Sequence, residues 1–140
     1  MPKSTRRAVG VGGVFFRSRD PAKLAEWYRN HLGIKIQDGV ALFSWRAFRP
    51  PHRPAQTVWA LFPRDSDYFP KGQQSMVNYR VKHLERTLTR LKKEGVKVSP
   101  KSEVSEYGKF GWAFDAEGNK IELWEPPPGQ KRSRLEIPAE

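Results

Sequence analysis

Apolar residues recur with helical spacing in two stretches of the chain. Residues 20–33 carry a stripe that consists of Leu24, Trp27, Tyr28 and Leu32. Asp20 suits an N-cap, Pro21 the first helical position and Gly33 a left-handed stop. Residues 83–95 carry a second stripe, whose leucines and terminal glycine are Leu84, Leu88, Leu91 and Gly95. We therefore expect two amphipathic helices.

Short apolar segments of strand type surround both predicted helices. Strands are expected directly before the helices, at residues 13–17 and 76–81. After the first helix the expected strands are residues 40–48 and 57–62, with 34–37 as a further candidate. After the second they are residues 96–99, 110–114 and 121–124. Residues 115–119 have the composition of a turn, which predicts a hairpin between the last two strands.

This order of elements occurs twice. Residues 13–20 align with residues 76–83 at an offset of 63, which sets Arg17 against Arg80. After the shorter second helix the offset is 62. The pattern predicts two copies of a strand–helix–strand–strand–strand unit. We divide the chain into a basic N-terminal tail, a first module, a second module and a polar C-terminal tail, at residues 1–9, 10–66, 73–128 and 129–140.

Composition narrows the class of protein. The chain has 140 residues, of which 37% are hydrophobic and 12% aromatic, so we expect a folded domain rather than disorder. With no cysteine, disulfides, thiolate metal sites and a cysteine nucleophile are excluded. No apolar run approaches the roughly 20 residues of a membrane span, and no apolar segment of a secretion signal follows the basic start. We expect a cytoplasmic protein that does not bind membranes.

The charge is strongly positive, at +11. The terminal segments 1–9 and 129–140 contribute +3 and +1, which leaves +7 on the central body. This excess favours an anionic partner such as a carboxylate or a phosphate. Nucleic acid is not expected, because no recognition helix or base-stacking motif accompanies the basic tails.

Three segments together resemble the vicinal oxygen chelate superfamily, which includes glyoxalase I, bleomycin-resistance proteins and extradiol dioxygenases. They are residues 13–33, 76–95 and 114–126, and the last, with Asp115, Gly118, Asn119 and Glu122, is the most specific. The resemblance implies an α+β fold in which paired βαβββ modules form a curved mixed sheet around a cleft. It also implies a homodimer.

Enzymes of that superfamily hold a divalent metal at four positions, two in each module, with His, Glu or Gln as ligands. Carried over one by one, these positions fall on Gly13, Ala60, Met76 and Glu122. Only Glu122 has a suitable donor, and one carboxylate does not hold a catalytic metal. The three histidines, His31, His52 and His83, lie in separate places. We therefore expect no metal and no other cofactor.

Strand alternation extends the cleft face beyond these four positions. The candidate ligand-binding residues are Phe15, Arg17, Phe62, Met76, Asn78, Arg80, Glu122 and Trp124. The opposite face then holds an apolar set that would pack under the helices, which is Val14, Phe16, Trp59, Leu61, Val77, Tyr79 and Val81. Arg17 and Arg80 would form a shared clamp for an anion. Alternatively, Glu122 pairs with one of these arginines and all three are structural.

We predict a glyoxalase/bleomycin-resistance-like protein that binds an anionic or aromatic small molecule without a catalytic metal. The alternative is a metal-dependent glyoxalase-like lyase or dioxygenase with non-standard ligands, drawn from Glu106, His52 or a partner chain. Whether the protein is an enzyme stays open. The candidate catalytic residues are Glu122, Glu106 and Tyr107.

Overall fold

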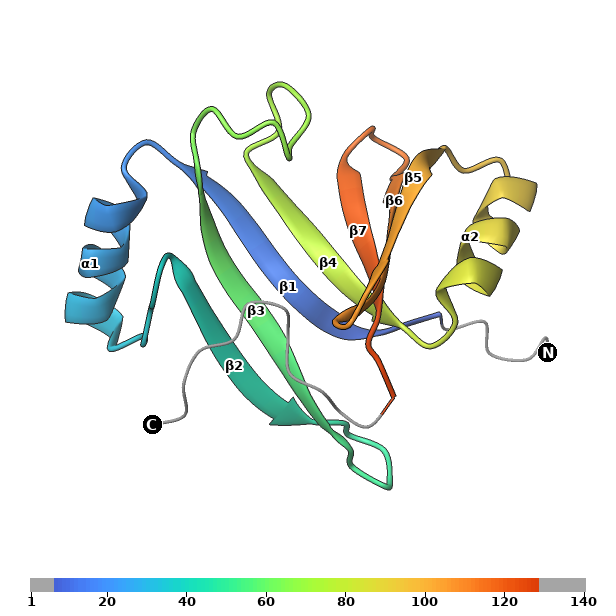
Figure 1. Ribbon diagram of the computed structural model, residues 1–140, viewed down its shortest axis with the longest axis horizontal. Coiled ribbons are helices and arrows are strands. Elements are labelled where there is room, and N and C mark those ends of the chain that lie inside the picture. Colours follow the sequence, from blue (N-terminus) through green and yellow to red (C-terminus); the bar gives the residue numbers. More distant parts are fainter. Residues whose placement is uncertain (1–6, 129–140) are drawn as a thin grey trace.

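The computed structural model describes residues 7–128. In chain order the elements are β1 (Ala8–Ser18), α1 (Pro21–Leu32), β2 (Val40–Arg46), β3 (Pro54–Pro63), β4 (Ser75–Val81), α2 (Leu84–Lys93), β5 (Val98–Ser105), β6 (Gly108–Phe114) and β7 (Lys120–Glu125). All seven strands form one mixed sheet in the order β2-β3-β1-β4-β7-β6-β5. The helices lie at opposite ends of this sheet (Figure 1). The α+β fold expected from the resemblance is confirmed.

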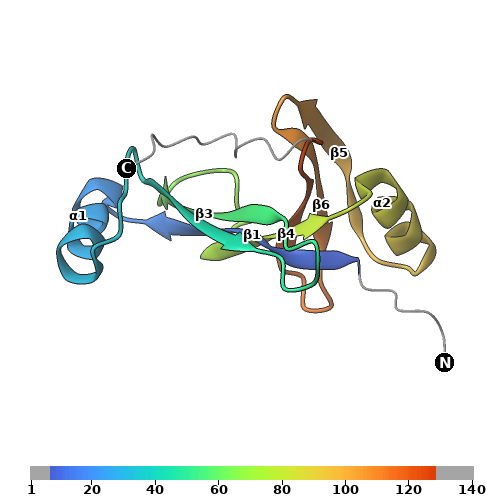
Figure 2. The same cartoon turned by 90° about the horizontal axis from the view of Figure 1, so that it is seen from below.

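The internal repeat is visible in the strand register. Parallel pairing of β1 with β3 sets Phe15 opposite Ala60 and Arg17 opposite Phe62. Parallel pairing of β4 with β7 forms the corresponding pairs of the second module. Asn78 lies opposite Glu122, and Arg80 lies opposite Trp124. Antiparallel pairing of β1 with β4 joins the two copies at the centre. Figure 2 shows that the sheet is strongly bent, with β5 and β6 turned steeply away from β1 and β3.

The apolar side chains divide between the two faces of the sheet. Beneath α1, Ala25 and Leu24 pack on Trp59, Leu61 and other residues of β1 and β3. Beneath α2, the core consists of Val81, Leu84 and Leu123 with partly buried neighbours, among them Tyr79, Leu88 and Leu91. On the face away from the helices, a separate cluster contains Phe15, Val58, Ala60, Phe69 and Met76. The alternation expected from the sequence therefore assigns these core residues to the correct faces.

The ends of α1 follow the predicted capping pattern. The Asp20 carboxylate accepts a hydrogen bond from the Lys23 backbone N–H at 3.1 Å. Pro21 occupies the first turn, and Gly33 ends the helix in the left-handed region with a φ of 65°. A side-chain acceptor and a residue that tolerates positive φ satisfy the terminal backbone groups.

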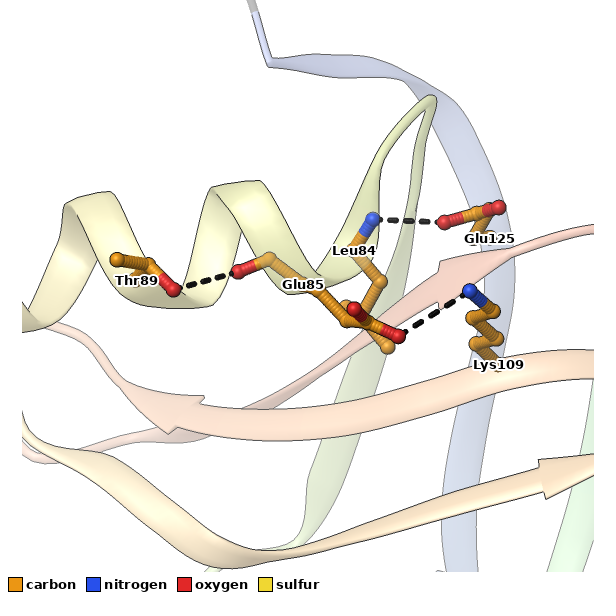
Figure 3. A network of polar contacts seen from close by, with 5 residues as sticks. All are labelled: Leu84, Glu85, Thr89, Lys109 and Glu125. Atoms are coloured by element: carbon orange, nitrogen blue, oxygen red, sulfur yellow. Dashed lines mark hydrogen bonds and ion pairs between the residues drawn. The ribbon is translucent and has the colours of Figure 1, made fainter.

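The start of α2 is stabilised differently, because the side chain of its N-cap residue, His83, makes no capping hydrogen bond. Instead, the Glu125 carboxylate at the end of β7 accepts from the Leu84 backbone N–H at 2.8 Å (Figure 3). Glu85 in the same turn accepts from the Lys109 ammonium of β6 at 3.2 Å. The first turn of α2 is thus tied to β6 and β7.

Several element boundaries differ from expectation. Residues 34–37 form no strand, and only Gln37 makes an isolated bridge, to Val40. The Ile36 side chain packs under α1, and its carbonyl accepts from the Arg29 guanidinium, so this backbone group is satisfied without a strand partner. β1 begins at Ala8, inside the expected N-terminal tail. The other tail assignments concern residues 1–6 and 129–140, which lie outside the described residues.

No helix within residues 7–128 is both long enough and apolar enough to cross a membrane.

Substitution of Leu123 by alanine tests the core beneath α2. Leu123 is 5% exposed and packs against Val81 and Leu84. We expect Leu123→Ala to lower the free energy of unfolding by about 2–5 kcal/mol, measured by urea denaturation. The matched control is Leu32→Ala at a position that is 63% exposed, where we expect a loss of less than about 1 kcal/mol. Equal losses in the two variants would contradict this core assignment.

Candidate functional site

A cavity of about 340 Å³ lies between the β2–β3 hairpin and the end of β7. Among residues 7–128, its lining contains two arginines, two tryptophans and no acidic side chain. The lining residues are Ser44, Trp45, Arg46, Pro54, Ala55, Gln56, Arg80, Trp124, Pro126 and Pro127. The volume lies in the range of small-molecule sites. The lining gives the cavity a positive charge.

Arg80 is the central polar group of this cavity. Its guanidinium carbon lies 5.0 Å from the ring centroid of Trp124 and 5.8 Å from that of Trp45. Nη1 donates to the Gln56 carbonyl at 3.4 Å, a long hydrogen bond. Burial lowers the pKa of the Arg80 guanidinium, yet an arginine remains protonated at neutral pH. A permanent, partly desolvated cation therefore faces the cavity.

Both tryptophan walls are held in place by hydrogen bonds. The Trp124 Nε1–H donates to the Tyr107 carbonyl at 2.8 Å, and the ring stacks on Phe110 at an interplanar angle of 5°. The Trp45 Nε1–H donates to the Thr57 hydroxyl at 2.8 Å. A Cβ on Gly10 would lie 2.6 Å from the Trp45 ring, so a side chain at position 10 would displace this wall.

The other half of the cleft is closed by residues 64–74, the segment that joins β3 to β4, which we call the linker. Arg17 anchors this linker through four hydrogen bonds to backbone carbonyls. Nε donates to Gln73 at 3.0 Å, Nη1 to Arg64 at 2.5 Å, and Nη2 to Phe69 and Pro70 at 3.0 and 3.3 Å. The guanidinium also lies 5.0 Å from the Phe69 ring centroid. These contacts give Arg17 a structural role in the linker.

Aromatic side chains of the linker cover the candidate residues of the first module. Tyr68 stacks on Phe62 with the ring centroids 5.5 Å apart, and Phe69 is buried in the cluster with Phe15 and Met76. Phe15, Phe62 and Met76, three of the expected ligand contacts, therefore pack against the protein's own linker.

Glu122 is completely buried at the centre of the sheet. Its carboxylate accepts from the Asn78 amide at 2.5 Å and from the Trp112 indole N–H at 3.1 Å. The Asn78 Oδ1 is buried and has no hydrogen-bond partner, and a Cβ on Gly12 would collide with it. Asn78 and Glu122 thus form a polar pair inside the molecule, away from the cavity lining.

The expected shared clamp of Arg17 and Arg80 is not formed. β1 and β4 are antiparallel, and Arg80 lies opposite Gly10, whereas Arg17 is seven residues further along β1. At about 3.3 Å per residue, this separates the two positions by about 23 Å along the strand. Because the two strands are antiparallel, residues that are related by the repeat and lie near a strand end are found at opposite ends of the β1–β4 pair.

The remaining candidates lie outside the cavity. Glu106 is exposed, and Tyr107 contributes its carbonyl to Trp124. Trp45 and Arg46 line the cavity but were not among the expected contacts. Side chains alternate between the two faces along β2, and this alternation places Arg46 on the cleft face. Arg46 could therefore have been predicted from the sequence as a cleft residue. The sequence held no such signal for Trp45, whose ring reaches the cavity because of the hairpin geometry and the space at Gly10.

The donor set does not fit the divalent metal of the superfamily's enzymes. The four equivalent positions carry Gly13, Ala60, Met76 and the buried Glu122. In the described part of the chain no three His, Asp or Glu side chains come together as a possible metal site. His31 packs on Trp27, and His52 contacts the Ala47 carbonyl in the β2–β3 hairpin.

Comparison with known sequences decides the family. The sequence profile of the Glyoxalase/Bleomycin resistance protein/Dioxygenase superfamily matches residues 10–123. The chain belongs to this superfamily. No curated protein matches the chain.

Solved structures of similar fold include methylmalonyl-CoA epimerases. The Mycobacterium tuberculosis enzyme is 23% identical, with a TM-score of 0.57 over 89% of this chain and 93% of its own. A Streptomyces coelicolor variant in complex with 2-nitronate-propionyl-CoA is 13% identical, with a TM-score of 0.58 over 85% and 98%. A methylmalonyl-CoA epimerase in complex with methylmalonyl-CoA and NH4+ is 13% identical, with a TM-score of 0.61 over 89% and 99%. These likenesses establish the fold of this superfamily member.

Loss of the Arg17 guanidinium should loosen the linker. We expect Arg17→Met to lower the free energy of unfolding by about 2–3 kcal/mol, because hydrogen bonds from a charged donor to the linker carbonyls are lost. Limited trypsin digestion should then cut faster after Arg64 and Lys71, both in the linker. Arg19→Met, at an exposed position, is the control. An unchanged cleavage rate in Arg17→Met would show that Arg17 does not hold the linker.

Proposed function

We propose that this superfamily member binds an anionic small molecule with an aromatic or other flat apolar part, in the cavity around Arg80, without a catalytic metal. The observation that carries the proposal is the position of Arg80 between Trp45 and Trp124, in a cavity whose described lining has no acidic side chain. Arginine has five N–H donors, and within residues 7–128 the guanidinium makes a single hydrogen bond.

The chemistry of the cavity favours a carboxylate or phosphate attached to a flat group. A guanidinium matches either anion with two parallel hydrogen bonds, and poor hydration of a half-buried cation strengthens such bonds. The tryptophan rings offer stacking surface. Arg46 adds a second positive charge at the rim. One structural neighbour is a methylmalonyl-CoA epimerase in complex with methylmalonyl-CoA, a ligand that carries a carboxylate, which agrees with the proposed charge of the ligand.

Binding of simple aromatic acids tests this proposal. We expect some members of a panel of benzoates, phenylacetates and indole carboxylates to quench tryptophan fluorescence on binding, because Trp45 and Trp124 line the cavity. Arg80→Met should weaken that binding about ten- to a hundredfold, because a charge-assisted hydrogen bond to a desolvated anion contributes roughly 1.5–3 kcal/mol.

Two controls belong with this experiment. Arg19→Met removes a positive charge at an exposed position outside the cavity lining and should leave the affinity within about twofold. The neutral amide of each acid should bind more weakly than the acid. Equal affinities of acid and amide, or an Arg80→Met variant that binds as tightly as wild type, would contradict the proposal.

The alternative function, a metal-dependent lyase or dioxygenase, rests on the retention of Glu122 at one superfamily ligand position. We expect the purified, dialysed protein to hold no stoichiometric divalent metal, because the other three positions lack a suitable donor. Elemental analysis measures this directly. About one metal ion per chain that is lost in Glu122→Ala would support the alternative instead.

We also propose that the protein is a homodimer in the cytoplasm. The dimer expectation comes from the superfamily, and light scattering on the full chain would measure the oligomeric state.

A further inference from the structure

Another, smaller cavity lies between the start of β1 and the first turns of α2. It has a volume of about 130 Å³ and is lined by Arg7, Lys82, His83, Arg86, Thr87 and Arg90. We call it the basic groove. It shares no lining residue with the cavity around Arg80.

Cations provide most of the lining of the basic groove. Arg86 and Arg90 lie four residues apart within α2, so their side chains lie on the same face of the helix, and Lys82 precedes the N-cap residue His83. Like charges at this spacing destabilise a helix. Within residues 7–128 none of the three forms an ion pair. The fold thus tolerates an unfavourable arrangement that an anion between the side chains would relieve.

The neighbouring carboxylates have other partners. Glu94 accepts two hydrogen bonds from the Arg7 guanidinium, at 2.9 and 2.7 Å, and this contact lowers the pKa of Glu94. Glu85 pairs with Lys109, and Glu125 accepts from the Leu84 backbone N–H, both on the side of α2 that meets β6 and β7 (Figure 3). Glu94 therefore offsets Arg7, and the nearby charge of Arg90 also lowers the pKa of Glu94. Lys82 and Arg86 form no ion pair within residues 7–128.

We infer that the basic groove binds the phosphoryl group of a small molecule. Two guanidinium forks and an ammonium provide the donors that a phosphate requires. The volume corresponds to about four water molecules, which suits one tetrahedral oxyanion. The site does not depend on the N-terminus of α2, because Glu125 already occupies the Leu84 N–H.

The ligand class is a phosphate monoester or a diphosphate rather than a nucleic acid. Among residues 7–128 no Phe, Tyr or Trp side chain lines the groove, and the His83 imidazole is its one aromatic ring. The groove therefore lacks the series of rings on which successive bases stack. Its cations converge on one small cavity instead of following a strand of phosphates.

Isothermal titration of the full chain with inorganic phosphate, pyrophosphate and glycerol 3-phosphate tests this site. The informative variant is Arg86→Gln/Arg90→Gln. Its matched control is Arg19→Gln/Arg49→Gln, which removes the same charge from exposed positions outside the groove. We expect the first variant to weaken pyrophosphate binding at least tenfold and the control to change it less than twofold. Circular dichroism establishes that both variants are folded.

Three results would overturn the inference. They are an absence of wild-type binding at millimolar pyrophosphate, an equal loss of affinity in both variants, and tighter binding of a short single-stranded oligonucleotide that both variants weaken equally. The last two results would indicate a general attraction of anions to a basic surface. The groove and the Arg80 cavity share no lining residue. None of these three results therefore bears on the experiment with aromatic acids.

Discussion

Antiparallel hydrogen bonding between β1 and β4 joins the two modules into one sheet, and the rest of the structure follows from it. The register sets Gly13 against Asn78 and Phe15 against Met76, so the pseudo-twofold axis passes between these pairs. In two antiparallel strands related by a twofold axis, equivalent residues near the middle of the strands lie close together. Equivalent residues near the strand ends lie far apart. The residues near the axis are consequently buried, and the arginines near the strand ends lie in two separate environments.

The two related arginines show how similar local sequences acquire different roles. Each lies beside an aromatic residue in the same register, Phe62 for Arg17 and Trp124 for Arg80. In the first module the linker passes over the guanidinium and supplies four carbonyl acceptors. Within residues 7–128 no linker fills the equivalent space in the second module, where β7 continues into Pro126 and Pro127 of the cavity lining. Among the described residues this asymmetry of the connections leaves a cavity in one half of the cleft.

Positively charged side chains gather at two places in the described structure, the cavity around Arg80 and the basic groove beside α2. Within residues 7–128 the Arg80 cavity has no acidic lining, and Glu94 offsets Arg7 and Arg90 at the basic groove. The other carboxylates near α2 serve its first turn and its contact with β6. Whether a cation is neutralised therefore depends on which carboxylates the fold places beside it, and less on the net charge of the chain. The buried Glu122 carboxylate accepts hydrogen bonds from an amide and an indole inside the protein.

Sequence alone determined the elements whose signals are local. The caps of α1, the two apolar stripes, the hairpin at residues 115–119 and the alternation of faces are encoded within a few residues, because hydrogen bonding and burial there depend on near neighbours. The repeat and the superfamily fold also followed from the sequence. Residues 34–37 were misassigned as a candidate strand because their apolar side chains serve packing under α1.

The site was decided by tertiary structure. Alternation gives the face on which a side chain lies but neither its position along the cleft nor what covers it, so the separation of Arg17 from Arg80 required the register of β1 and β4. The closure of the first half required the path of the linker, and Trp45 became a wall because Gly10 leaves space for its ring. Such long-range contacts join residues far apart in the chain, and no local pattern of apolar and polar positions records them.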